Sequence, residues 1–136
     1  EQCIKDLYYG YNDSAIHLRL DFKPDFTKIQ NDFEIRVNIG QDHPARVHAR
    51  ITRGELSGVE FWRNGQQASV HDATGAAIIA AYSEIFEATL SYAALGLEPG
   101  QTTCLQVALW LDQLPVQVLP NQGWLALELS EYVAGW

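Results

Sequence analysis

The chain has 136 residues and a net charge of −8, with nine Lys and Arg residues against 17 Asp and Glu residues. Hydrophobic residues make up 47% of the chain and charged residues 19%, which is typical of a folded domain and excludes a disordered chain. No uncharged stretch is long enough for a membrane span, and we recognise no secretory signal in the first residues. From the length we expect one domain over residues 1–136. Because the chain contains no methionine and begins Glu1-Gln2-Cys3, we expect it to be a piece cut from a larger protein, which we place in the cytoplasm.

The charges are distributed unevenly along the chain. Residues 1–63 contain all nine Lys and Arg residues and ten acids, whereas residues 64–136 contain seven acids and no Lys or Arg. An acidic half of this kind lacks the clustered cations that nucleic acid binding requires. Two readings remain: a solvated acidic surface, or a surface for a cation or a basic neighbouring domain.

The first predicted unit is a β-hairpin. Apolar residues alternate up to Tyr11, and Ile16, Leu18, Leu20 and Phe22 then alternate strictly with polar residues. A period of two over eight residues predicts a strand buried on one face. Residues 12–14 (Asn-Asp-Ser) lie between the two runs and favour a tight turn.

The same alternation returns along the rest of the chain. It predicts strands over residues 33–39, 47–51, 59–62, 85–90, 105–112, 116–119 and 125–129, with turns at Asn64-Gly65 and Pro99-Gly100. Residues 76–82 fit a strand buried on both faces or a short helix, and one helical turn is expected near 91–95, ending at Gly96. The prediction is an all-β fold, an antiparallel two-sheet sandwich of the jelly-roll or carbohydrate-binding-module kind.

Two tryptophans are predicted to face outward. Trp62 and Trp110 occupy the polar positions of their strands. An exposed indole can stack on the apolar face of a sugar, and an indole packed against another domain has the same sequence pattern. Trp62 and Trp110 are therefore candidates for sugar binding or for domain packing.

Cationic side chains occupy the polar positions of the first three long strands. They are His17, Arg19, Arg36, Arg46, His48 and Arg50. If these strands form a meander, four arginines gather on one sheet, and His17 and His48 can meet. The group then serves either as a lattice of weak cross-strand ion pairs or as a surface that docks on carboxylates of a neighbouring domain.

Catalytic and metal-binding patterns are not recognised. Glu84 and Glu87 would point to opposite faces of a strand, so they do not form a glycosidase pair, and no nucleophile motif is present. The four histidines lack zinc-site spacing, and we predict no metal or cofactor. Cys3 and Cys104 are either buried thiols or a bridge between an early and a late strand.

Several motifs together resemble known β-sandwich domains. Leu7-Tyr8-x-Gly10-Tyr11-Asn12, followed by the alternating strand to Phe22, resembles the sandwich after the catalytic barrel of family-57 glycoside hydrolases. The second half resembles family-9 carbohydrate-binding modules and DOMON domains through these motifs: Phe86-Glu87-Ala88, Leu95-Gly96-Leu97-x-Pro99-Gly100 and Leu119-Pro120-Asn121-x-Gly123-Trp124. The resemblance covers most of the chain, more weakly over residues 54–74.

The resemblance implies a jelly-roll-like domain at the non-catalytic end of an α-glucan-processing enzyme. No catalytic residue carries over, because the family's catalytic carboxylates belong to the barrel. The Met and His pair that holds haem in DOMON domains lacks its Met here. The leading hypothesis is an accessory domain that packs on and stabilises the catalytic barrel. The others are a module that binds α-glucan through Trp62 and Trp110, and a free-standing enzyme.

Overall fold

A computed structural model describes residues 3–41, 44–72 and 75–129. The fold is an all-β sandwich with two short helices, as the alternation predicts. The strands are β1 (Ile4–Tyr11), β2 (Ala15–Phe22), β3 (Phe33–Ile39), β4 (Ala45–Thr52), β5 (Glu55–Arg63), β6 (Gln66–Ala68), β7 (His71–Asp72), β8 (Gly75–Ala76), β9 (Ile78–Tyr82), β10 (Ile85–Ser91), β11 (Thr102–Leu111), β12 (Leu114–Leu119) and β13 (Leu125–Glu128). The helices are α1 (Pro24–Ile29) and α2 (Tyr92–Leu95).

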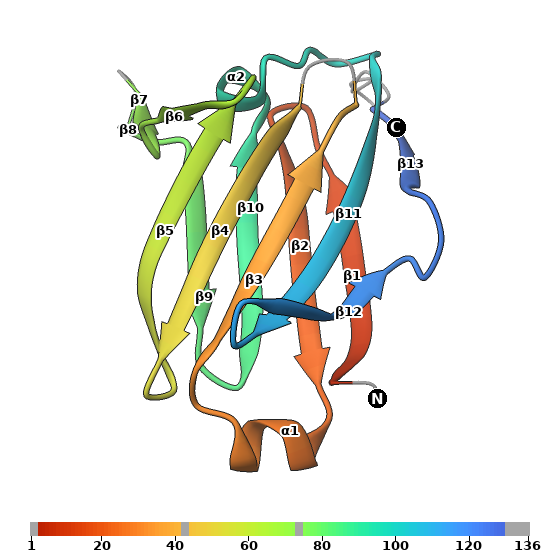
Figure 1. Ribbon diagram of the computed structural model, residues 1–136. Coiled ribbons are helices and arrows are strands. Elements are labelled where there is room, and N and C mark those ends of the chain that lie inside the picture. Colours follow the sequence, from red (N-terminus) through yellow and green to blue (C-terminus); the bar gives the residue numbers. More distant parts are fainter. Residues whose placement is uncertain (1–2, 42–43, 73–74, 130–136) are drawn as a thin grey trace.

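Two antiparallel sheets form the layers of the sandwich. The smaller sheet has the order β1-β2-β10-β9, and the larger has the order β12-β11-β3-β4-β5-β6, with β13 also pairing with β11. Figure 1 shows the two sheets face to face, with the larger in front and α1 and α2 at opposite ends. Strands β7 and β8 form a separate small ribbon.

The core lies between the inner faces of the two sheets. Leu18, Ile35 and Val107 are 4%, 0% and 0% exposed, so the positions predicted to be apolar and inward are inside. Burial alternates residue by residue along β3 and β4, as a pleated sheet with one buried face requires. Burial of this core is the main favourable term in folding.

The predicted first hairpin forms with the predicted turn. The side-chain oxygen of Asn12 accepts hydrogen bonds from the backbone N–H groups of Ser14 and Ala15, at 2.8 and 2.9 Å. Helix α2, predicted as one turn, begins after Ser91, whose side chain accepts from the N–H of Ala94, and ends at Gly96 with φ 71°. A positive φ of this size favours glycine at the end of a helix.

Helix α1 was not predicted. Pro24 stands in its first turn, where the missing N–H costs nothing, and Phe26 turns inward. The Phe26 ring lies 5.8 Å from that of Phe22 and 5.1 Å from that of Phe33. The helix was missed because six residues are too few to show a helical period in the sequence. The contact of Phe26 with Phe22 and Phe33 closes one end of the sandwich.

The first three long strands do not form a meander, so the condition under which four arginines would gather on one sheet and His17 would meet His48 is not met. β2 pairs with β1 and β10 in the smaller sheet, whereas β3 and β4 pair in the larger sheet. Helix α1 carries the chain from one layer to the other (Figure 1). His17 and Arg19 therefore lie on the opposite outer face from His48 and Arg36.

Three further details complete the fold. Residues 78–82 form a strand at the edge of the smaller sheet, and Ile79 in it is 50% exposed, so this strand is not buried on both faces. Cys104 carries a free thiol and is not bridged to Cys3, which is buried. Within the described ranges, neither helix has the length and apolar character needed to cross a membrane.

Candidate functional site

The outer face of the larger sheet brings the predicted residues of β3, β4, β5 and β11 into rows. In one row, Trp62 is in register with Arg46, Arg46 with Asn38, and Asn38 with Gln106. The next row places Glu60, His48, Arg36 and Ala108 in register, and a third places Arg50, Glu34 and Trp110 in register. We call the group Arg36, Arg46, His48, Trp62 and Trp110 the Arg–Trp surface.

Both indoles lie outward, as predicted, and the guanidinium group of an arginine lies over each ring. The guanidinium carbon of Arg36 lies 3.6 Å from the centroid of the Trp110 ring, and that of Arg46 lies 4.9 Å from that of Trp62. These are cation–π distances, and the first is a close stack. One face of each indole is thus covered, which leaves less bare aromatic surface for a sugar.

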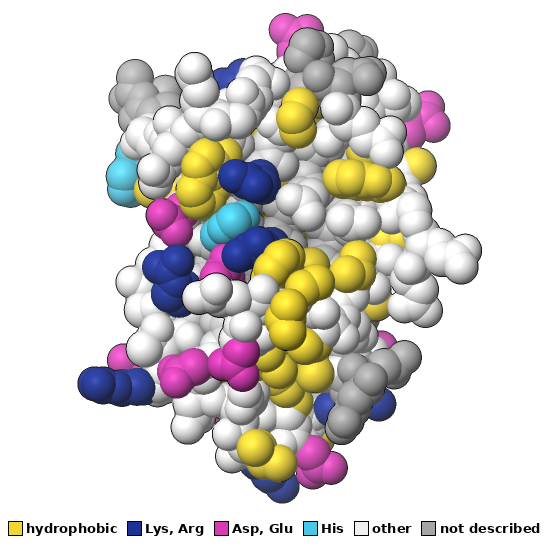
Figure 2. All heavy atoms as spheres, viewed as in Figure 1, with side chains coloured by type: hydrophobic (Ala, Val, Ile, Leu, Met, Phe, Trp, Pro, Cys, Tyr) yellow, Lys and Arg dark blue, Asp and Glu magenta, His cyan; other side chains and the backbone are white. Residues whose placement is uncertain are grey.

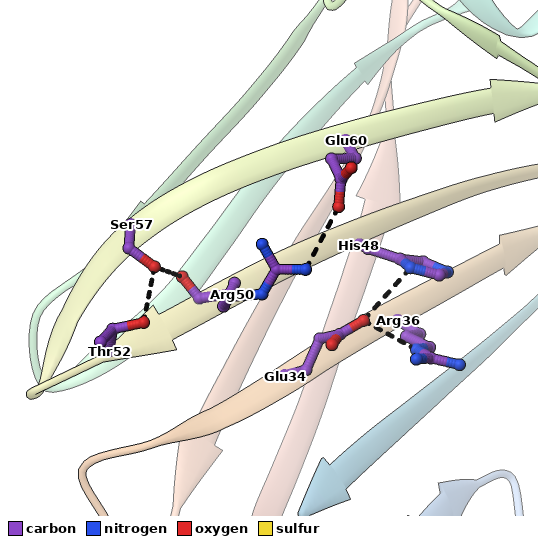
Figure 3. Close-up of polar contacts among 7 residues, drawn as sticks. All are labelled: Glu34, Arg36, His48, Arg50, Thr52, Ser57 and Glu60. Atoms are coloured by element: carbon purple, nitrogen blue, oxygen red, sulfur yellow. Dashed lines mark hydrogen bonds and ion pairs between the residues drawn. The ribbon is translucent and has the colours of Figure 1, made fainter. Parts of the chain in front are cut away.

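Glu34 organises the centre of the surface. Its Oε1 atom accepts from Nε of Arg36 at 2.8 Å and lies 3.2 Å from Nδ1 of His48 (Figure 3). Across β4 and β5, a second ion pair joins Arg50 to Glu60 at 3.3 Å. Glu34 was not among the predicted site residues, although its outward position in an alternating strand was readable.

His48 is partly buried between Glu34 and Trp62. Its ring centroid is 4.6 Å from that of Trp62, and its Nε2 atom is buried without a hydrogen-bond partner among the described residues. Burial lowers the pKa of His48; Arg36 and Arg46 lower it further, whereas Glu34 and Glu60 act in the opposite direction. In the neutral ring, Nδ1 donates to the Glu34 carboxylate, so Nε2 holds an unsatisfied lone pair.

A depression of about 330 Å³ opens beside these side chains, and we call it the central depression. It is lined by Arg36, Asn38, Arg46, His48, Gln106, Ala108, Trp110, Pro115 and Val118. Ala108, the smallest of these residues, leaves space beside the longer side chains of Arg36 and Val118 in the neighbouring strands. Figure 2 views this face and shows Arg and His side chains gathered beside hydrophobic ones near its middle.

The local charge of this face is positive on an acidic chain. Arg36 and Arg50 have carboxylate partners in Glu34 and Glu60. Arg46 is exposed and, among the described residues, takes part in no ion pair. This face therefore presents one guanidinium group, that of Arg46, without a carboxylate partner beside the central depression.

His17 and Arg19 belong to a different environment. Arg19 is paired with Asp21 at 2.7 Å and lies 5.4 Å from the ring centroid of Tyr8, all on the smaller sheet. His17 contacts Thr89 at 3.2 Å. The hydrogen bond and charge of Asp21 raise the pKa of Arg19. These two residues are not part of the Arg–Trp surface.

In the part of the chain that the structure describes, no group of three His, Cys, Asp or Glu side chains is arranged to hold a metal ion. Gln106 and Ala108 of the central depression were not among the predicted site residues, because a polar or small residue at an outward position carries no signal without its cross-strand neighbours. Comparisons with protein-family models, curated proteins and solved structures find no match to this chain.

Proposed function

We propose that this chain is a non-catalytic β-sandwich domain that docks on a neighbouring domain through the Arg–Trp surface and stabilises it. The observation that supports this is the uncompensated Arg46 beside the Arg36–Trp110 stack on a protein with a net charge of −8. Arg and Trp are enriched at the centres of protein interfaces, where planar groups make large contacts at low entropic cost. By the motif resemblance, the neighbour we propose is the catalytic barrel of a family-57-like, α-glucan-processing glycoside hydrolase.

The role proposed for the arginines is orientation and specificity. A guanidinium held on an indole loses little further freedom on binding a carboxylate, so less entropy opposes the contact. The apolar side chains of Pro115 and Val118 on the neighbouring strand β12, which are in register with Trp110 and Ala108 and line the central depression, add hydrophobic area next to the polar contacts. This combination is typical of the contact between two domains of one protein.

The test is thermal unfolding of the parent protein with substitutions in the surface. Arg46→Gln with Trp110→Leu is expected to lower the melting temperature of the parent's catalytic domain. Arg19→Gln with Tyr8→Leu removes one arginine and one aromatic residue from the opposite sheet and is the matched control. Equal melting temperatures for the catalytic domain in both double variants would refute the docking role.

A second candidate is binding of α-glucan by Trp62 and Trp110. Its support is that two partly exposed indoles lie on one face of one sheet. The guanidinium groups over both rings count against it, because a sugar must displace them to stack there. Affinity electrophoresis in glycogen gels tests it: retardation that is lost in Trp62→Leu supports glucan binding, and unchanged migration removes it.

A further inference from the structure

The central depression has donors on two adjacent strands, and its lining residues include no Asp or Glu. Arg36 on β3 uses its Nε atom for Glu34, which leaves its two terminal nitrogens for another acceptor. Arg46 on β4 is in register with Asn38, two residues beyond Arg36, so the two arginines are diagonal neighbours. Such positions lie roughly 7–8 Å apart in an antiparallel pair, which long side chains can bridge around one small anion.

The walls of the depression are held in place. The amide nitrogen of Asn38 donates to Oε1 of Gln106 at 3.4 Å, and the amide nitrogen of Gln106 donates to the carbonyl of Gly123 at 3.3 Å. Trp110 supports Arg36 from one side. The site is therefore built before any ligand enters, which lowers the entropic cost of binding.

We infer that the central depression receives one carboxylate side chain, an Asp or Glu of the docked domain, between the guanidinium groups of Arg36 and Arg46. This inference rests on the proposed function and names the chemistry of the contact. Guanidinium and carboxylate are planar and match in geometry, and charge-assisted hydrogen bonds of this kind are short and strong.

The charge of the whole chain favours a single carboxylate over a polyanion. Away from this face the chain is acidic, with a net charge of −8 overall. A ligand with many negative charges meets repulsion from that surface. A lone carboxylate responds mainly to the nearest charges, since screening at physiological salt acts beyond about 8 Å.

Binding of a carboxylate in the central depression is linked to protonation of His48. Its ring faces Glu34 and Arg36 on β3, Arg46 on its own strand, and Glu60 on β5. The two arginines disfavour the charged ring, and a bound carboxylate offsets their field. A bound carboxylate therefore favours the protonated ring, so the affinity for a carboxylate is expected to rise as the pH falls through the range in which His48 titrates.

The experiment titrates the 136-residue chain with N-acetylglutamate amide, using N-acetylglutamine amide as the neutral isostere, and follows the Arg side-chain and His48 ring signals by NMR. We expect the acid but not the amide to shift these signals and to raise the pKa of His48. Arg46→Gln is expected to weaken binding about tenfold. Ala108→Leu fills the depression without changing any charge and is expected to block binding.

Arg19→Gln is the matched control, because it removes the same charge from the opposite sheet. Equal weakening by Arg19→Gln and Arg46→Gln, or full binding in Ala108→Leu, would mean diffuse attraction and overturn the inference. So would shifts caused equally by the acid and the amide. Because the titration needs no partner domain, it separates this inference from docking itself: carboxylate binding with no effect on the parent's melting temperature refutes docking alone.

Discussion

The guanidinium group of Arg36 stacks on Trp110, 3.6 Å from the ring centroid, although the two residues come from strands far apart in the chain. β3 and β11 are neighbours in the larger sheet, and Glu34 is the residue in register with Trp110. Arg36, two positions further along β3, reaches back diagonally over the ring and is held there by Glu34. The stack, the ion pair and the histidine thus form one connected unit.

The Arg36–Trp110 stack should contribute to stability in a way that a double-mutant cycle can measure. Arg36→Gln and Trp110→Leu, singly and together, are expected to give a coupling energy of about 0.5–2 kcal/mol in urea unfolding. The Arg46–Trp62 pair is the internal control, since Arg46 is exposed and its guanidinium carbon lies further from the ring, at 4.9 Å. A coupling energy as large for that pair would show that stacking distance is not what matters.

His48 should make stability depend on pH. Its pKa is lowered in the folded chain, chiefly by burial, so the unfolded chain, with an ordinary pKa of about 6.5, binds more protons at mildly acidic pH. The contribution of the neutral ring is therefore complete above the unfolded pKa and is lost as the pH falls below it. His48→Gln is expected to flatten the fall in unfolding free energy between about pH 7.5 and 5.5. His17→Gln, which leaves His48 in place, should keep the wild-type slope.

Gln117 should hold an edge of the sandwich together. Its side-chain oxygen accepts from the backbone N–H groups of Cys3 and Ile4, at 2.7 and 2.8 Å, and so connects β12 of the larger sheet to the start of β1 in the smaller one. Gln117→Leu is expected to cost about 1–3 kcal/mol of unfolding free energy, because two backbone donors lose their acceptor. Gln66→Leu, at an exposed position of β6, is the control. A loss of the same size in both variants would contradict this role.

Tyr92 should secure the first hairpin. Its hydroxyl donates to the backbone carbonyl of Asn12, and its own N–H donates to the carbonyl of Ser14. Tyr92→Phe removes only the hydroxyl and is expected to lower the unfolding free energy by about 1 kcal/mol. Tyr11→Phe, at a side chain 40% exposed, should change it little. If urea unfolding shows no difference between the two variants, the hydroxyl has no such role.

The alternation of apolar and polar residues determined the strands, their inner and outer faces and hence the all-β class. Leu18, Ile35 and Val107 lie inside because a pleated strand points every second side chain to the same face, and this relation is local. By the same reasoning, the sequence determined that Trp62, Trp110, Arg36, Arg46 and His48 face outward. The turn at Asn12 and the helical turn before Gly96 were readable for the same reason: their chemistry is contained within a few residues.

Only the tertiary structure decided which outward residues meet. Alternation has the same period in every sheet, so it could not show that Arg19 and Arg36 belong to opposite layers. It also could not place Arg36 over Trp110 or Ala108 in the lining of the central depression. These positions depend on the pairing of β3 and β11 across some seventy residues of chain. Strand pairing is set by the burial of the whole core. The chemistry of the outer face follows from that pairing and from no single segment.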